Sequence, residues 1–450
     1  MAPETQTPEQ LDIDTDMEAE LLEFSQRSVV IIGMATPGGE SKTTEVMDFL
    51  VGTKRNPEFT YPKQETVTEE SVEKYRAEGE DILARHTIPE KLRSTYEKFI
   101  EVRVKRGELG LAMRHYNEHK TPQTAAEFMN LNIEQYGEPD QATYLSLLQE
   151  SVTKVANKEM SPSAQRIFGE LQGLLPDFPE NEAIERFKPS QETMEWMQQV
   201  VDSLYGNMLR HVPETDELIG PVELHRIFET IVREEFGESA ADWSVDLRDA
   251  TSVYVDMKTK RVAIPHDRDP VTSLKAKQLV VHEIGIHMLR AVTGGETDIA
   301  PLQSGLDGYL SDEEGLGKVM EQAVEGKFVE AGVDHYITAG LAYFDKKDFR
   351  DTFEIKWRLK LLQSLKPGEE PTPEQVFTAR QSGIDGALRF FRGTNDLPLF
   401  MSLSYYNGTT DVWKYLEKIR GDDLQLSLLL AGKVSTSKEH QNVVLESSSR

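Results

Sequence analysis

Helical periodicity dominates the order of apolar and polar positions along this chain. After Thr68, which can cap a helix, apolar side chains recur every three or four residues, and Pro89 opens a second helical stretch. The same spacing continues to about residue 236, resumes after about residue 313 and breaks at Pro367 and Gly368. The pattern therefore predicts helices on both sides of a central segment.

Two short stretches of that central segment predict strands. Residues 252–257 and 261–264 are rich in β-branched and aromatic side chains, and the polar Lys258, Thr259 and Lys260 separate them. Such a pair is typical of a hairpin. We therefore expect an α+β fold, a mostly helical body with a small sheet.

The two ends of the chain are polar. Residues 1–50 begin with an acidic segment rich in Pro and Thr. Its apolar side chains are too few to compensate for the conformational entropy that the segment would lose on folding. An apolar run at 29–32 leads to glycines, but Gly39 stands where a phosphate-binding loop needs lysine, so a turn after a strand is favoured. We expect a largely flexible extension at 1–50 and a disordered Ser-rich tail at 433–450.

The remaining residues, 51–432, are long enough for one large domain with a sizeable core. We divide this domain into a helical N-terminal part at 56–236, a core at 237–345 that holds the hairpin, and a helical C-terminal part at 346–432.

Charge and composition exclude several classes of protein. Asp and Glu number 78 against 50 Lys and Arg, and the net charge of -28 would repel a phosphate backbone, so we expect no nucleic-acid partner. No apolar run approaches the roughly 20 residues that span a bilayer, and the first residues do not resemble a secretory signal. We therefore expect no membrane association and a cytoplasmic location. Because the chain has no cysteine, a transition metal would need His, Asp or Glu ligands.

One helical stretch, at 277–290, carries the residues of a metal site. His282 and His287 flank Glu283, as the ligands and general base of zinc peptidases do. On a regular helix a five-residue separation leaves the imidazoles about 140° apart, too far to share an ion. A turn widened to the i→i+5 pattern, with Gly285 where the backbone deforms, would restore a common face. The alternative is a pair of partly buried histidines in a core helix.

A third ligand could come from the glycine-containing stretch 305–317. Glu313 and Glu314 begin a helix there, and two histidines with one carboxylate leave a fourth position open for water. The alternative is a capping box, because Ser311 and Glu314 have the S-x-x-E spacing. Spacing alone favours neither interpretation.

Further motifs accompany these segments. They read Val-His-Glu-Ile-Gly-Ile-His-Met-Leu-Arg at 281–290, Gly-Leu-Asp-Gly-Tyr at 305–309, Glu-Glu-Gly-Leu-Gly at 313–317, Asn-Pro-Glu-Phe-Thr-Tyr at 56–61, Gln-Tyr-Gly-Glu-Pro at 135–139 and Arg-Phe-Phe-Arg-Gly at 389–393. Together they resemble the family of the microtubule-associated tyrosine carboxypeptidases and the bacterial flavohemoglobin expression-modulating QEGLA-motif proteins. The resemblance covers about residues 56–410.

The resemblance implies a zincin-like metallopeptidase body and a zinc ion (Zn2+) bound by His282 and His287. It makes Glu283 the general base and Glu314, rather than Glu313, the third ligand. The implied substrate is a peptide or protein C-terminus from which one residue, aromatic residues included, is removed.

Removal of a C-terminal residue requires a cation for the terminal carboxylate. Arg389 and Arg392 belong to a matched motif and can bind a carboxylate with two hydrogen bonds, although surface ion pairs are the alternative for both. Tyr309 could donate to the oxyanion or simply pack in its loop. His266 and His335 lie outside the matched motifs and receive no role.

The chain departs from the family pattern at two places. Gly317 replaces the alanine of the QEGLA motif, and Met401 and Ser402 stand where the family has the Lys and Asp of an F-T-K-D turn. The alternative function is a catalytically silent, zincin-like binding or regulatory protein, which the loss of the F-T-K-D turn favours and the retention of Glu283 disfavours.

Overall fold

The computed structural model describes residues 13–178, 184–250 and 252–447 and is mostly helical, with one small sheet. Its first half contains α1 (Thr15–Gln26), α2 (Ile31–Met34), α3 (Gly39–Val51), η1 (Pro62–Thr66), α4 (Glu69–Arg85), α5 (Glu90–His119), α6 (Pro122–Tyr136), α7 (Gln141–Ala156), α8 (Pro162–Gln172) and α9 (Gln191–Leu209). Next come α10 (Pro221–Ile231), η2 (Val232–Phe236), η3 (Gly237–Ala240), β1 (Ser244–Arg248), β2 (Tyr254–Asp256), β3 (Arg261–Pro265), α11 (Ser273–Leu279), η4 (Val280–Met288) and α12 (Leu289–Gly295). The last elements are α13 (Ala300–Ser304), α14 (Tyr309–Glu325), α15 (Val333–Tyr343), α16 (Phe349–Ser364), α17 (Pro373–Phe391), η5 (Phe400–Leu403), α18 (Ser404–Ile419), α19 (Asp423–Leu430) and α20 (Lys438–Ser447). The predicted α+β class is confirmed.

Helix starts and breaks agree with their local signals. Thr68 caps α4 in a capping box with Ser71, in which each side chain accepts from the backbone amide of the other residue. Pro89 is the residue before α5, and Pro367 and Gly368 lie between α16 and α17. No described helix combines the length and the apolar composition needed to cross a bilayer.

The sheet contains the predicted hairpin and one additional strand. β2 pairs antiparallel with β3, with Val255 opposite Val262, and Asp256 closes the turn by accepting from two backbone amides. β1 pairs in parallel with β3, which makes β3 the central strand of the order β1-β3-β2. β1 was not predicted because its side chains are mostly polar and exposed.

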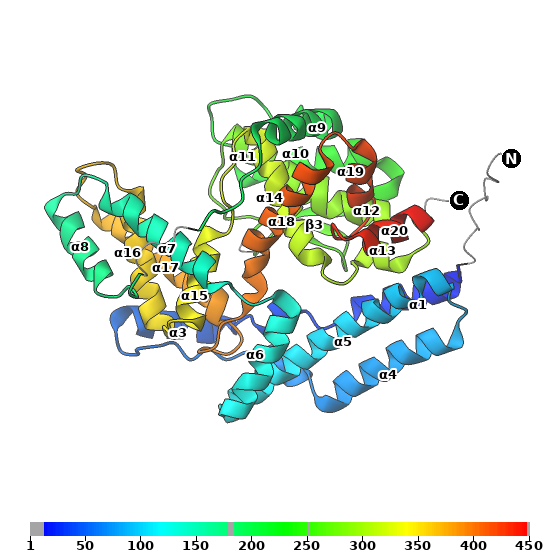
Figure 1. Ribbon diagram of the computed structural model, residues 1–450, viewed down its shortest axis with the longest axis horizontal. Helices are drawn as coiled ribbons and strands as arrows, with labels where there is room; N and C mark the ends of the chain where they lie inside the picture. Colours follow the sequence, from blue (N-terminus) through cyan, green and yellow to red (C-terminus); the bar gives the residue numbers. More distant parts are fainter. Residues whose placement is uncertain (1–12, 179–183, 251, 448–450) are drawn as a thin grey trace.

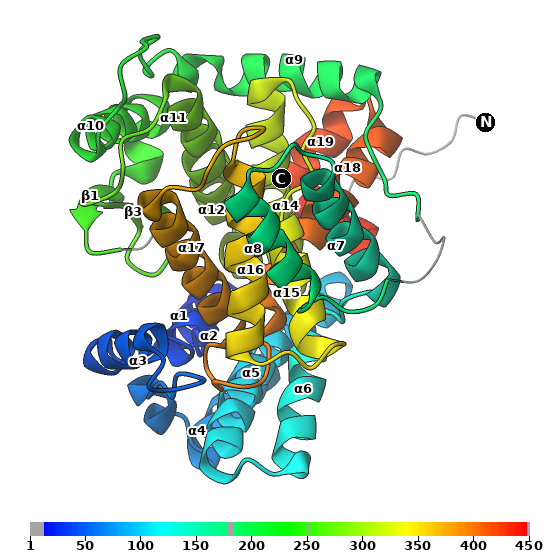
Figure 2. The same ribbon diagram turned by 90° about the vertical axis from the view of Figure 1, so that its left-hand side faces the viewer.

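The helices, whose arrangement Figures 1 and 2 show, pack around two hydrophobic cores. The larger core joins α1, α4 and α5 to η4, α14, α18 and the C-terminal helices, whereas the smaller joins α7 and α8 to α15, α16 and α17. Met129 and Tyr136 of α6 pack against both cores. Helices far apart in sequence therefore bury their apolar faces together. The division of one domain into parts at 56–236, 237–345 and 346–432 stays a prediction.

The N-terminal extension is not flexible where the structure describes it. α1 buries Met17, Leu21 and Phe24 in the larger core and contacts α13. Residues 29–32 do not form a strand either, since residue 31 begins the short helix α2. The expectation of a flexible segment is wrong from residue 13 onward, because three apolar positions at helical spacing suffice to anchor an otherwise acidic helix; residues 1–12 lie outside the described part.

The C-terminal tail is also ordered in its described part. Lys433 and Val434 are buried, and α20 buries Val443 and Val444. The expectation of a disordered tail at 433–450 is therefore wrong up to residue 447, and residues 448–450 lie outside the described part. The segment is polar in overall composition, so the few side chains that pack into the core were not recognised from the sequence.

Candidate metal centre

The two histidines lie on one widened helix. α11, η4 and α12 form a continuous helical segment in which η4 has the π-helical, i→i+5 pattern. The imidazole centroids of His282 and His287 are 4.9 Å apart, so the rings share one side of the helix. The predicted widening is confirmed.

Gly285 makes room for an aromatic neighbour beside the widened turn. A Cβ at this position would lie 2.9 Å from the ring of Tyr205, whose hydroxyl donates to the Gly285 carbonyl at 3.1 Å. The close packing of α9 against η4 therefore requires a glycine at this position. A left-handed backbone is not the reason, because Gly285 does not have one. The tyrosine also provides the carbonyl with a partner inside the core.

Glu314 of α14 completes the cluster. One ligand atom from each of His282, His287 and Glu314 lies within 4.8 Å of the other two, and Glu314 Oε2 is 3.7 Å from His282 Nε2. Ser311 lies inside α14, which begins at Tyr309 after Gly308, so the capping-box interpretation is wrong.

Each histidine is oriented by a second carboxylate. His282 Nδ1 lies 2.7 Å from Glu321, and His287 Nδ1 lies 2.8 Å from Glu313. These contacts leave both Nε2 atoms available, which is the usual arrangement around zinc-binding histidines. The donor set of two imidazoles and one carboxylate therefore fits a zinc ion with an open fourth position.

The two orienting carboxylates are neutralised by cations. Glu321 forms ion pairs with Lys275 (3.2 Å) and Lys318 (2.8 Å). Glu313 forms ion pairs with Arg290 (3.1 Å) and with Lys433. The side chains of both cations are almost completely buried. Burial tends to raise the pKa of Glu313, but Lys433, His287 and Arg290 more than compensate, so its pKa lies well below the ordinary value.

The carboxylates around His282 favour its protonated form. Burial disfavours charge on His282, but the adjacent Glu314, Glu321 and Glu283 raise its pKa to about 9. Burial likewise opposes ionisation of Glu314, yet His282 and His287 lower its pKa. Metal binding at neutral pH would therefore have to displace a proton from His282.

The carboxylate of Glu283 lies on the same helix as the two histidines. It follows His282 on η4 and is buried, and burial raises its pKa, although the two histidines oppose that shift. Within the described ranges, no side chain donates a hydrogen bond to its carboxylate. The group is thus available to accept a proton from a molecule in the site.

Glycines let α14 approach its neighbours. A Cβ on Gly317 would lie 2.7–2.9 Å from three atoms of the His282 ring, so the departure from the family's alanine brings α14 directly against a proposed ligand. A Cβ on Gly315 would lie 2.2 Å from the backbone of Gly408 on α18. The approach at Gly408 also positions the start of α18 beside Glu314.

The predicted substrate arginines belong to a separate basic group. Arg389 Nη1 lies 3.4 Å from His335 Nε2, and Arg392 contacts the sulfur of Met401 at 3.7 Å. Neither guanidinium has a carboxylate partner in the described part of the chain, so the surface-ion-pair alternative is wrong there. Burial and Arg389 lower the pKa of His335 to about 3, which leaves this histidine neutral.

Tyr405 links this basic group to the metal cluster. The charge of Glu314, then burial, raise the pKa of Tyr405, while a hydrogen bond with Arg389 opposes the shift. The His335 ring lies 5.4 Å from the Tyr405 ring. The arginines therefore lie on the same side of the cluster as Tyr405.

Several of these residues were missed by sequence reasoning. Glu321 could have been found, because it lies two turns after Glu314 on the same helix face. His335, Tyr405 and Lys433 carry no local signal of their role. Tyr309, by contrast, is the first residue of α14 and packs its ring against Gly305. The exposed His266 pairs with Asp249 at 2.5 Å.

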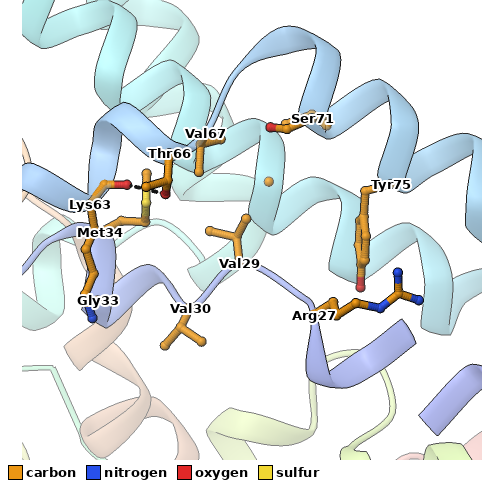
Figure 3. Close-up of a pocket in the computed structure, with 12 residues that line it drawn as sticks. Arg27, Val29, Val30, Gly33, Met34, Lys63, Thr66, Val67, Ser71 and Tyr75 are labelled. Atoms are coloured by element: carbon orange, nitrogen blue, oxygen red, sulfur yellow. Dashed lines mark hydrogen bonds between the residues drawn. The ribbon is translucent and has the colours of Figure 1, made fainter. Parts of the chain in front are cut away.

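A cavity of about 480 Å³ lies elsewhere, between residues 27–34 and helices α4 and α5 (Figure 3). Valines and Met34 line it, Lys63 and Arg27 mark its two ends, and Arg27 is already paired with Glu78. None of its lining residues belongs to η4 or α14, so it is not part of the metal cluster.

Comparisons with known proteins do not assign the chain: no family model, no curated protein and no solved structure matches it.

Proposed function

We propose that the protein is a zinc-dependent metallopeptidase of the carboxypeptidase type, related to the tyrosine carboxypeptidase and QEGLA-motif family. The observation that carries this proposal is the convergence of His282, His287 and Glu314, with Glu283 beside them on the same widened helix. The two orienting carboxylates support it, because each engages Nδ1 of its histidine and leaves Nε2 available to an ion.

Zinc held by these ligands would polarise a peptide carbonyl and make a water molecule more acidic. Glu283 takes the proton from the attacking water at its carboxylate and passes it to the departing amine. The raised pKa of its buried carboxylate supports this role, since a carboxylate with a raised pKa accepts a proton more readily. Glu313 and Glu321 hold the imidazoles in place.

The basic group supports cleavage at a C-terminus. In a chain with a net charge of -28, Arg389 and Arg392 are buried in large part, yet neither has a carboxylate partner among the residues that the structure describes. A substrate's terminal carboxylate would supply one through charge-assisted hydrogen bonds. The neutral His335 adds a polar contact without competing for the carboxylate.

The body is compatible with a zincin-like arrangement. The metal helix packs beside a small mixed sheet, and the short edge strand β2 contacts η4. An edge strand there could pair with an extended peptide. The proposed substrate is therefore a peptide or protein C-terminus.

The test uses purified, zinc-loaded protein and peptides with varied C-termini, with cleavage read by mass spectrometry. The wild type should remove the last residue of free peptides and leave amidated peptides intact. Glu283→Gln should lower cleavage by roughly 10² to 10⁴ without changing zinc content, because it keeps the side-chain shape but cannot accept the proton. Glu296→Gln provides a control on a partly exposed glutamate outside the cluster.

Each of the other possible outcomes would favour a different function. Bound zinc without cleavage of any peptide would favour the silent binding protein. Equal cleavage of free and amidated peptides would favour an endopeptidase and remove the role of Arg389 and Arg392.

A further inference from the structure

A C-terminal segment at 432–436 lies against both helices of the metal cluster. Arg290 of α12 donates through Nε to the Gly432 carbonyl at 2.9 Å and through Nη2 to the Val434 carbonyl. Thr436 donates to Asp312 of α14 through its backbone amide (2.5 Å) and its hydroxyl (2.9 Å). This segment therefore connects the histidine helix to the glutamate helix.

Lys433, at the centre of the segment, contacts the carboxylate that orients a proposed ligand. Its ammonium donates to Glu313 Oε1, the oxygen that also contacts His287 Nδ1. Both Lys433 and Glu313 are 3% exposed, so water cannot replace the lysine. The other orienting carboxylate differs, because Lys275 beside Glu321 keeps 41% of its side chain exposed.

Removal of the lysine would leave Glu313 with too little compensation for its burial. A buried carboxylate that loses one of its cations moves towards the partner that remains, which here is Arg290. That movement would take the fixed acceptor away from Nδ1 of His287, and the imidazole would no longer be held with Nε2 directed at the cluster.

We propose that Lys433 is a positioning residue of the metal centre: it acts through Glu313 on His287, so the segment at 432–436 raises the affinity for zinc. This inference rests on the proposed function only in requiring that zinc binds. Lys433 lies beyond residue 410, where the resemblance to the peptidase family ends.

The test measures zinc affinity of the full-length, metal-free protein by competition with a chromophoric chelator. Lys433→Met should weaken zinc binding by about 10- to 100-fold. Lys438→Met, at an exposed position of the same region, should bind like the wild type, and Lys275→Met should weaken binding less than Lys433→Met. The absorption spectrum of the Co²⁺ form should change in Lys433→Met, because the position of one imidazole changes.

A double-mutant cycle with Glu313→Gln separates positioning from a general loss of structure. If Lys433 acts through Glu313, Lys433→Met should weaken zinc binding no further in the Glu313→Gln background. Lys433→Gln supplies a second neutral variant if circular dichroism shows that Lys433→Met is unfolded.

Wild-type zinc affinity in a folded Lys433→Met or Lys433→Gln would overturn the inference and leave the proposed function intact. Equal weakening with and without Glu313 would also overturn it. A wild-type protein that binds no zinc would overturn both.

Discussion

Three of the four glutamates of α14, Glu313, Glu314 and Glu321, have different partners because of their angular positions on the helix. At about 100° per residue, Glu314 and Glu321 are only about 20° apart and both face His282, whereas Glu313 points about 100° away and meets His287. Only one of the two adjacent glutamates can therefore be a ligand on this side. The other has become the acceptor that orients the second histidine.

This arrangement predicts a graded loss of zinc at the residue scale. Glu314→Gln should remove most bound zinc because a ligand is lost, and Glu321→Gln should retain zinc with about 10- to 100-fold weaker affinity because only an orienting contact is lost. Chelator competition measures both. Glu325→Gln, at an exposed position of α14, should bind like the wild type, and full zinc binding by Glu314→Gln would remove Glu314 from the ligand set.

At the scale of elements, α14 and α18 cross at a contact between two glycine backbones. A Cβ on Gly408 would lie 1.8 Å from the Ser311 carbonyl oxygen, and one on Gly315 would lie 2.2 Å from Gly408. The crossing brings Tyr405 beside Glu314, so Gly315 and Gly408 position the site through their close backbone contact.

Gly408→Ala should therefore lower the free energy of unfolding by at least about 1–3 kcal/mol, the usual cost of overpacking, measured by urea denaturation. Gly206→Ala in α9 is the matched control, because a Cβ there meets nothing within 4 Å. This second variant should be about 0.5–1 kcal/mol more stable than the wild type. Equal effects of the two variants would contradict the close helix crossing.

The attachment of α1 to α4 depends on a titratable pair. Asp14 caps α1 by accepting from the amides of Asp16 and Met17, and its second oxygen lies 2.8 Å from His86 Nδ1. The hydrogen bond with Asp14 raises the pKa of His86, against the effect of burial. The stabilisation is therefore complete below about pH 6.5, where the unfolded histidine is also protonated, and is lost as pH rises through the raised value.

His86→Gln should consequently destabilise the protein more at about pH 6 than at about pH 9. Urea unfolding of the variant and the wild type at both pH values measures the difference. His119→Gln is the control, since the His119 side chain is 63% exposed and its nearest carboxylate is 4.0 Å away. A cost of His86→Gln that is the same at both pH values would show that the ion pair does not form.

At the scale of the whole molecule, both ends of the chain support the central site. α1 belongs to the core that contains η4, and its Glu18 accepts from the Ala300 amide at 2.6 Å. The C-terminal segment contacts α12 and α14. The site thus depends on residues at the two extremes of the sequence.

Leu21→Ala should accordingly cost about 2–5 kcal/mol of unfolding free energy, as expected for a fully buried leucine. Leu424→Ala, at a position that is 61% exposed, should change stability by no more than about 0.5 kcal/mol. A negligible effect of Leu21→Ala in chemical denaturation would show that residues 13–26 belong to a flexible extension, as the sequence predicted.

Local chemistry made part of this protein predictable. A five-residue histidine spacing can share an ion only across a widened turn, and η4 has that turn. The hairpin at β2 and β3 and the capping box at Thr68 likewise depend on residues a few positions apart. The choice of Glu314 over Glu313 needed the family resemblance, because spacing alone left the capping box open.

The sequence by itself determined the helical class, the hairpin, the widened turn and the candidate ligands, since each follows from periodicity or from neighbours along the chain. Only the tertiary structure decided that Lys433 supports a carboxylate 120 positions earlier, that His335 meets Arg389, and that the polar ends belong to the core. The physical reason is that a buried charge or carbonyl needs a partner but does not specify which distant segment supplies it. That partner depends on how the helices pack.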